Sequence, residues 1–101
     1  MDDRIVGFAS VVATGRVGEL EDLFVDPDWM RCGVGRALVV DAIDKARDKG
    51  LSRINVMANE HALVFYKNVG FVYDGTSRLR FGTGHRMHID VPSRPERGRL
   101  K

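Results

Sequence analysis

Cysteine and long apolar runs are scarce in this chain of 101 residues, and each shortage excludes a class of protein. A single cysteine, Cys32, cannot form an internal disulfide, so we expect a reducing compartment rather than a secreted disulfide scaffold. No apolar run approaches the roughly 20 residues that a membrane-spanning helix needs. The chain opens on an acidic stretch, Met1-Asp2-Asp3, the reverse of the basic start of a secretory signal. The sequence therefore predicts a cytoplasmic protein without a membrane segment.

Charge is nearly balanced but unevenly distributed. The formal net charge is +2 at pH 7, yet residues 92–101 hold four basic side chains and one acidic side chain, and so carry +3. Because this tail is rich in proline and charge, we predict that residues 92–101 are disordered and that residues 1–91 form one small domain. The tail has no interleaved aromatic residues, so nucleic-acid binding is not predicted.

A glycine-rich segment between an apolar strand and an amphipathic helix has the character of a phosphate cradle. It reads Arg31-Cys32-Gly33-Val34-Gly35-Arg36-Ala37-Leu38. The glycines allow close backbone approach, the first helical turn offers free N–H groups, and the two arginines add charge-assisted bonds. A Walker loop requires Gly-Lys-Ser/Thr, and a dinucleotide fingerprint requires a third glycine or alanine where Leu38 stands, so neither fits. A turn that merely starts a helix remains the structural alternative.

A second motif lies one helix and one strand downstream. Residues 59–71 carry the pattern N-x-x-A-x-x-F-Y-x-x-x-G-F. Together with the glycine segment and the preceding Leu-Glu-Asp-Leu-Phe-Val run, this resembles the GNAT superfamily of acetyl-CoA-dependent N-acetyltransferases. The resemblance covers about residues 4–91. Met30 departs from the family pattern, which usually has Gln or Arg three residues before the first loop glycine.

Apolar periodicity predicts the elements of an α/β fold. We expect strands at 5–12 and 17–25 around a turn, a helix at 33–49 capped by Gly50, and a strand at 51–58. A short helix containing Phe65 and Tyr66 follows, then strands at 71–81 and 86–91 around the turn Gly82-Thr83-Gly84. The alternation slips between Leu20 and Leu23, which indicates a β-bulge. The fold class implied by the resemblance is a minimal GNAT-type mixed sheet flanked by a long and a short helix.

The resemblance also implies roles for particular residues. Tyr66 matches the tyrosine that protonates the departing thiolate, and Glu21 matches a carboxylate that accepts the amine proton. Glu19 is the reserve base, and Asp22 is a candidate to attract a cationic amine. The residues expected to contact acetyl-CoA are Phe24, Val25, Arg31, Cys32, Gly33, Val34, Gly35, Arg36, Ala37, Asn59 and Tyr66. Asn59 suits equally the N-cap of a helix, and Tyr66 suits a core position.

Other reactive residue types gain no role from their spacing. The three histidines, His61, His85 and His88, form no metal-binding pattern with cysteine or carboxylate, so no metal is predicted. Cys32 is expected to be incidental to the chemistry, because the mechanism of the resembled family forms no covalent intermediate.

The chain lacks the strand and helices that precede residues 5–12 in a full family member and that usually form one wall of the acceptor site. The sequence therefore does not identify the acceptor amine. We expect an N-acetyltransferase acting on a primary amine of a small molecule or protein, with a non-catalytic acetyl-CoA-binding or assembly module as the alternative. An open sheet edge at the first strand also predicts a homodimer.

Overall fold

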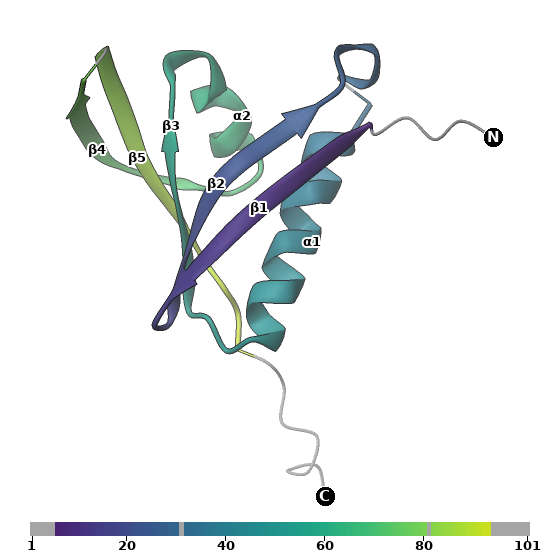
Figure 1. The fold of residues 1–101 in the computed structure, drawn as a ribbon, viewed down its shortest axis with the longest axis vertical. Coiled ribbons are helices and arrows are strands. Elements are labelled where there is room, and N and C mark those ends of the chain that lie inside the picture. Colours follow the sequence, from purple (N-terminus) through teal and green to yellow (C-terminus); the bar gives the residue numbers. More distant parts are fainter. Residues whose placement is uncertain (1–5, 31, 81, 94–101) are drawn as a thin grey trace, which may run out of the picture.

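The computed structural model describes residues 6–30, 32–80 and 82–93. In these ranges the chain forms one five-stranded sheet with strand order β1-β2-β3-β5-β4 and two α-helices. The strands are β1 (Gly7–Thr14), β2 (Val17–Val25), β3 (Arg53–Ala58), β4 (Val72–Leu79) and β5 (Gly82–Asp90). Helix α1 (Val34–Asp48) joins β2 to β3, and α2 (Leu63–Asn68) joins β3 to β4 (Figure 1). The predicted α/β fold class is confirmed.

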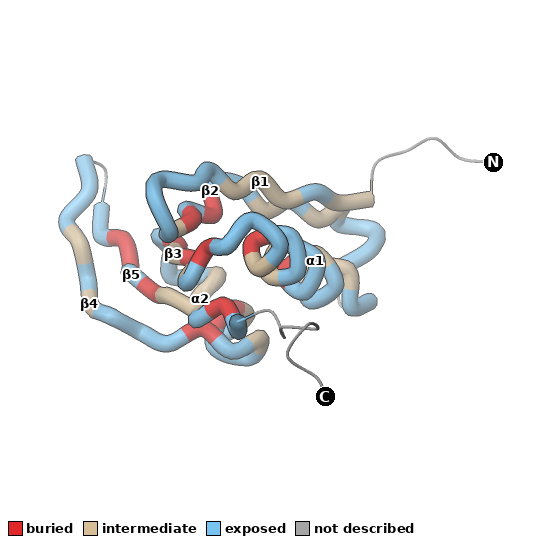
Figure 2. The backbone as a smooth tube through the Cα atoms, turned by 90° about the horizontal axis from the view of Figure 1, so that it is seen from below, coloured by how far each residue is buried: buried red, intermediate tan, exposed pale blue. Residues whose placement is uncertain are grey.

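The sheet is mixed because the crossover through α1 places β3 beside β2 in the same direction, and a second crossover through α2 places β4 beyond β5. The β1–β2, β3–β5 and β4–β5 pairs are antiparallel, whereas β2 and β3 run parallel. Both helices lie on the concave side of the curved sheet (Figure 2). Two 3-10 turns, η1 (Pro27–Trp29) and η2 (Glu60–Ala62), lead toward α1 and α2. No described helix is long and apolar enough to span a membrane.

Helix α1 forms where the sequence predicts it. Gly33 is its N-cap and Lys49 its C-cap, and Gly50 follows with a φ of 79°, the left-handed conformation that a glycine after a helix adopts. Its buried residues, Val39 and Ala46, face the sheet. The sheet contributes the two most buried large side chains, Ile54 and Met87, each 1 % exposed. The core therefore lies between α1, α2 and the central strands β3 and β5.

One predicted turn is wrong. Gly82, Thr83 and Gly84 belong to β5, where they pair with Leu79, Arg78 and Ser77 of β4. A Cβ atom at Gly84 would lie 2.6 Å from the Sδ of Met57, so the glycine lets the Met57 side chain pack closely over β5. The first predicted strand begins at Gly7, and Ile5 lies outside the described residues. Pro92 and Ser93 follow β5 without regular structure, and the rest of the predicted tail is also outside the described residues.

Candidate active site

The sheet opens between its two parallel strands. The β2–β3 register runs from Val17↔Arg53 to Leu20↔Val56 and ends there. Beyond it β2 continues to Val25 against β1, and β3 continues to Ala58 against β5, so the two strands diverge (Figure 1). Within the described ranges, no strand pairs after Leu20 with the edge of β2 that faces β3. Backbone N–H and C=O groups of residues 21–25 therefore offer hydrogen bonds to an extended ligand.

A β-bulge lies at the start of this opening. Ser10 pairs with Asp22 and Val11 with Leu20, which leaves Glu21 as the extra residue of β2. The bulge reverses the alternation, so that Leu20 and Leu23 both pack against the core on the helix side of the sheet. The bulge predicted from the slip between these two leucines is confirmed.

The first turn of α1 lies beside the end of β2. Gly33 adopts a left-handed conformation with φ 84° and, as N-cap, has no side chain with which to satisfy the N–H groups of the turn. No acidic residue stands in that first turn. Free N–H groups and the positive end of the helix dipole therefore form an anion-binding position.

Close packing joins this turn to α2. A Cβ atom at Gly35 would lie 2.9 Å from the Phe65 ring and 3.8 Å from the side chain of Val25, so glycine lets the helix approach both. At the residue after Gly35, the Arg36 guanidinium donates a hydrogen bond of 3.1 Å to the carbonyl oxygen of Asn68, the last residue of α2. The start of α1 thereby contacts α2 at its middle and at its last residue.

A groove of about 670 Å³, here called the α1–α2 groove, lies between these elements. Its volume is in the range of small-molecule and cofactor sites. Its lining is mainly apolar, with a cation, an imidazole, a phenol and an amide among the groups at its wall. The lining residues are Leu23, Val25, Met30, Gly33, Gly35, Arg36, His61, Ala62, Val64, Phe65, Tyr66, Asn68 and Val69.

Tyr66 is the buried phenol of this groove. Its side chain is 7 % exposed, and its ring packs edge to face against Phe65 and Phe71, with ring centroids 5.2 Å apart in both pairs. Burial raises the pKa of Tyr66 above its usual value of 10.0, because the phenolate would lose its hydration. The phenol thus stays protonated at neutral pH, the state required of a proton donor.

The remaining residues expected to contact the cofactor occupy different positions. Gly33, Gly35, Arg36 and Val25 line the groove together with Tyr66. Phe24 instead projects from the opposite face of the sheet, where its ring lies 5.6 Å from that of Phe8. Cys32 and Ala37 are exposed, Val34 is partly buried, and Arg31 lies outside the described residues.

Asn59 acts as a helix cap in the structure. As the N-cap of η2, it accepts at Oδ1 a hydrogen bond of 2.9 Å from the backbone N–H of Ala62, the third residue of this turn. The alternative raised by the sequence, an N-cap, is therefore present. Binding of a ligand by Asn59 remains a prediction. Because Oδ1 is used by the cap, the side-chain NH₂ group would donate the hydrogen bond to the ligand.

The acidic residues of β2 differ in their partners. Glu19 accepts a hydrogen bond of 3.2 Å from the Asn55 side chain on the sheet face opposite the helices. Glu21 is the bulged residue, and no hydrogen bond or ion pair within the described ranges engages its carboxylate. Asp22 pairs with Ser10 in the strand register. Within the described ranges the carboxylates of Glu21 and Asp22 are thus both unengaged at the opening, and Glu21 is the one at the bulge.

The sequence did not single out several groove residues. Phe65 and Leu23 lie within the family motifs but have no predicted contact with the cofactor, and Val64 and Val69 have no predicted role. Their role depends on how α2 packs against β2 and α1, which no local pattern encodes.

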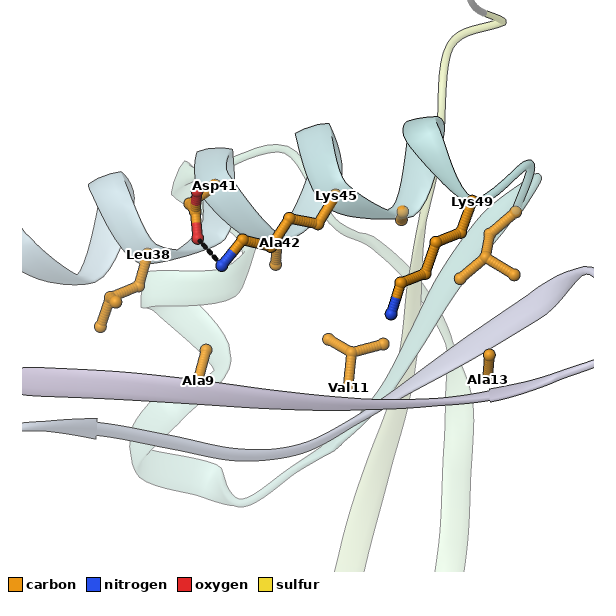
Figure 3. Close-up of a pocket in the computed structure, with 10 residues that line it drawn as sticks. Ala9, Val11, Ala13, Leu38, Asp41, Ala42, Lys45 and Lys49 are labelled. Carbon is orange, nitrogen blue, oxygen red and sulfur yellow. Dashed lines mark ion pairs between the residues drawn. The ribbon is translucent and has the colours of Figure 1, made fainter.

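A second, smaller pocket of about 170 Å³ lies between β1 and α1 and is called here the β1–α1 pocket. Small residues from β1, Ala9, Val11 and Ala13, form its floor, and the Asp41–Lys45 ion pair lies at its rim (Figure 3). It is remote from Tyr66 and from the opening between β2 and β3. The candidate active site is therefore the α1–α2 groove.

Comparison with known proteins shows the family of this chain. Residues 1–71 match the model of the acetyltransferase (GNAT) family. The chain belongs to this family. It is 39% identical over 75 residues to glucosamine 6-phosphate N-acetyltransferase of Trypanosoma brucei brucei, across 67% of this chain and 51% of that protein. It is 40% identical over 77 residues to the peptidyl-lysine N-acetyltransferase YjaB of Escherichia coli (strain K12), across 76% of this chain and 48% of that protein.

Solved structures of acetyltransferases share the fold. The crystal structure of an aminoglycoside 6'-N-acetyltransferase complexed with coenzyme A superposes with a TM-score of 0.84 at 19% identity, covering 95% of this chain and 72% of that one. This likeness concerns the fold alone. The GNAT domain described here spans about half the length of the two curated relatives named above.

Burial of Tyr66 predicts a measurable dependence of stability on alkaline pH. Because the folded-state pKa lies above the unfolded value of 10.0, the native state holds the phenolic proton more tightly, and stability is lost as pH rises through 10. In urea titrations from pH 8 to 11, the wild-type protein should lose stability more steeply above pH 10 than the Tyr66→Phe variant. Identical slopes in the two proteins would show that Tyr66 ionises as freely in the folded state as in the unfolded chain.

Proposed function

We propose that this GNAT domain is an acetyl-CoA-dependent N-acetyltransferase that transfers acetyl to a primary amine. The proposal rests on three features that lie next to one another. They are the diverging strands after Leu20, the first turn of α1, which has no side-chain cap, and the buried phenol of Tyr66. An extended thioester ligand with a phosphate-bearing end requires a site of this order. Family membership supports the same reaction.

The residues present fit acetyl-CoA. The N–H groups at the start of α1 would take the pyrophosphate, Gly33 leaves that surface free of a side chain, and Gly35 lets the turn pack against Phe65. The β2 backbone over residues 21–25 would bond the pantetheine amides. Arg36 lines the groove and adds positive charge there, while Arg31 is proposed from the sequence alone.

The proposed chemistry needs two proton movements. The amine nitrogen attacks the thioester carbonyl carbon, the C–S bond breaks, the amine loses a proton and the thiolate gains one. Glu21 would accept the first proton, directly or through water, and Tyr66 would donate the second. Burial keeps the phenol of Tyr66 protonated at neutral pH, which is the form that can donate a proton to the departing thiolate.

The acceptor is proposed no more finely than a primary amine of a small molecule or a protein. One relative is named for glucosamine 6-phosphate and the other for peptidyl-lysine, and this chain has about the same identity to both. A module that binds acetyl-CoA without turnover is the alternative function. Thiol release in the presence of an amine panel separates the two.

We also propose a cytoplasmic homodimer in which a second copy covers β1 or the exposed sheet face beside it. The β1 edge over Gly7–Thr14 carries no charge, whereas the opposite edge strand, β4, contains Asp74 and Arg78. Natural sheets protect free edges with charges and bulges, and β1 has neither. Phe8 and Val12 of β1 are 48 % and 50 % exposed, and the β1–α1 pocket adjoins the same strand (Figure 3).

Acetyl-CoA should raise the melting temperature, and Gly35→Asp should abolish this shift. At a concentration one hundredfold above Kd, a ligand stabilises the native state by about 2.7 kcal/mol. An aspartate at position 35 would meet the Phe65 ring and bring a negative charge toward the pyrophosphate. Val40→Asp, which adds the same charge at an exposed position of α1, is the control and should keep the shift. A normal shift in Gly35→Asp would place the cofactor elsewhere.

Tyr66→Phe should lower kcat by about ten- to a thousandfold while the affinity for acetyl-CoA stays nearly unchanged. The substitution keeps the packing against Phe65 and Phe71 and removes only the hydroxyl. Equal losses of binding and turnover would instead identify a structural tyrosine. In the same assay, a loss of rate in Glu21→Gln with wild-type activity in Glu19→Gln supports Glu21 as the base, and the reverse result assigns that role to Glu19.

Light scattering at tens of micromolar protein should give the mass of a dimer. Val12→Lys places a charge on the β1 edge and should shift the equilibrium to monomer, because a paired lysine would be desolvated. Val72→Lys adds the same charge to β4 at a position that is 55 % exposed, and should leave the dimer intact. A monomeric wild-type protein contradicts the dimer.

A further inference from the structure

Three polar side chains outside the α1–α2 groove form a continuous hydrogen-bonded chain. His85 Nε2 lies 2.8 Å from Glu60 Oε1, and His85 Nδ1 lies 3.1 Å from the Tyr73 hydroxyl. Because a carboxylate only accepts, Nε2 carries the proton toward Glu60, and in the neutral ring Nδ1 accepts from Tyr73. Both nitrogens of a buried imidazole, 8 % exposed as a residue, are thus satisfied.

This chain of bonds joins two parts of the fold. Glu60 begins η2, directly after β3, whereas Tyr73 belongs to β4 and His85 to β5. Lys67 of α2 adds a second contact to the same hairpin, with its Nζ 5.9 Å from the centre of the Tyr73 ring. The segment formed by η2 and α2 is therefore attached to the β4–β5 hairpin at two places, Glu60 near the start of the segment and Lys67 near the end of the segment.

The attached segment is too short to hold its own conformation. The 3-10 turn has three residues and α2 has six, well below the roughly 12 residues at which an isolated helix becomes even marginally stable in water. Its geometry must come from tertiary contacts. On the groove side these are Phe65 against Gly35 and the bond from Arg36 to Asn68. On the hairpin side, the most buried polar contact is His85.

We propose that His85 is a positioning residue: by holding Glu60 and Tyr73 it fixes the segment from η2 to α2, and with it the Tyr66 hydroxyl, relative to the cofactor groove. It touches no reacting atom. Its effect on turnover rests on the proposed acetyltransferase function, whereas its effect on the segment does not. The two effects are measured separately.

The hairpin supplies a matched control in His88. This second histidine of β5 contacts the Asp74 carboxylate oxygens at 2.8 and 2.9 Å, on the sheet face opposite the helices. It pairs with Asn55 and Val72 in the register, and its side-chain partners among the described residues are Asp74 and Asp90, neither of which belongs to η2 or α2. His85 and His88 thus offer the same chemistry on the same strand, and only His85 reaches the segment that bears Tyr66.

The direct test is amide hydrogen exchange across residues 62–69. His85→Leu keeps an apolar side chain of similar volume in the buried site and removes both bonds, so protection of these amides should fall about tenfold. His88→Leu should leave them unchanged, and His85→Gln, whose amide can still donate to Glu60, should retain most of the protection. If His85→Leu fails to fold, Glu60→Ala, which removes only the exposed partner, takes its place. Unchanged protection in the folded variant, or equal loss in His88→Leu, overturns the proposal.

The second measurement concerns turnover. In His85→Leu, kcat should fall by about tenfold with little change in the KM for acetyl-CoA, and His85→Gln should recover most of the rate. A loss confined to KM overturns the positioning of Tyr66. If the wild-type protein shows no turnover, the proposed function fails, and the exchange experiment alone decides whether His85 anchors the segment.

Discussion

Beyond Leu20, strand β2 is paired on one side only, and the rest of the candidate site depends on this constraint. A sheet normally satisfies its backbone groups by pairing both edges of a central strand. Here the Glu21 bulge turns β2 away from β3, and the separation leaves a row of hydrogen-bonding groups open to a ligand. The same bulge keeps Leu20 and Leu23 on the helix side, so that the strand diverges without losing its contact with the core.

The position of α2 follows from that opening. Because β3 and β2 separate, the chain turns at Asn59 after β3, and the short helix α2 packs beside the first turn of α1. Gly35 allows the approach, and Phe65 fills the space between the two helices. The phenol of Tyr66 is buried by this packing, and burial in turn raises its pKa. Strand geometry, helix packing and the protonation state of one side chain are therefore parts of a single arrangement.

Much of this arrangement follows from local sequence. Periodic apolar residues predict the long helix from Val34 to Asp48, glycines mark its two ends, and a slip in the alternation marks the bulge in β2. Each of these features is present in the structure. The β4–β5 hairpin is harder to predict, because Gly82 and Gly84 suggest a turn, whereas in β5 Gly82 has a φ of 119° and Gly84 leaves room for the Met57 side chain. The partners of Arg36 and His85 lie 32 and 25 residues away, on Asn68 and Glu60. Such pairs depend on strand register and helix placement, which periodicity does not specify.

The most direct test of the central claim is an NMR titration of the labelled protein with acetyl-CoA. If the opening and the α1–α2 groove form the cofactor site, the largest amide shifts will fall in residues 21–25 of β2 and 33–37 at the start of α1. Residues of the β1–α1 pocket, such as Ala9, Ala42 and Ala46, will serve as internal controls and should move little. Shifts concentrated in that pocket, or none at saturating ligand, would contradict the account.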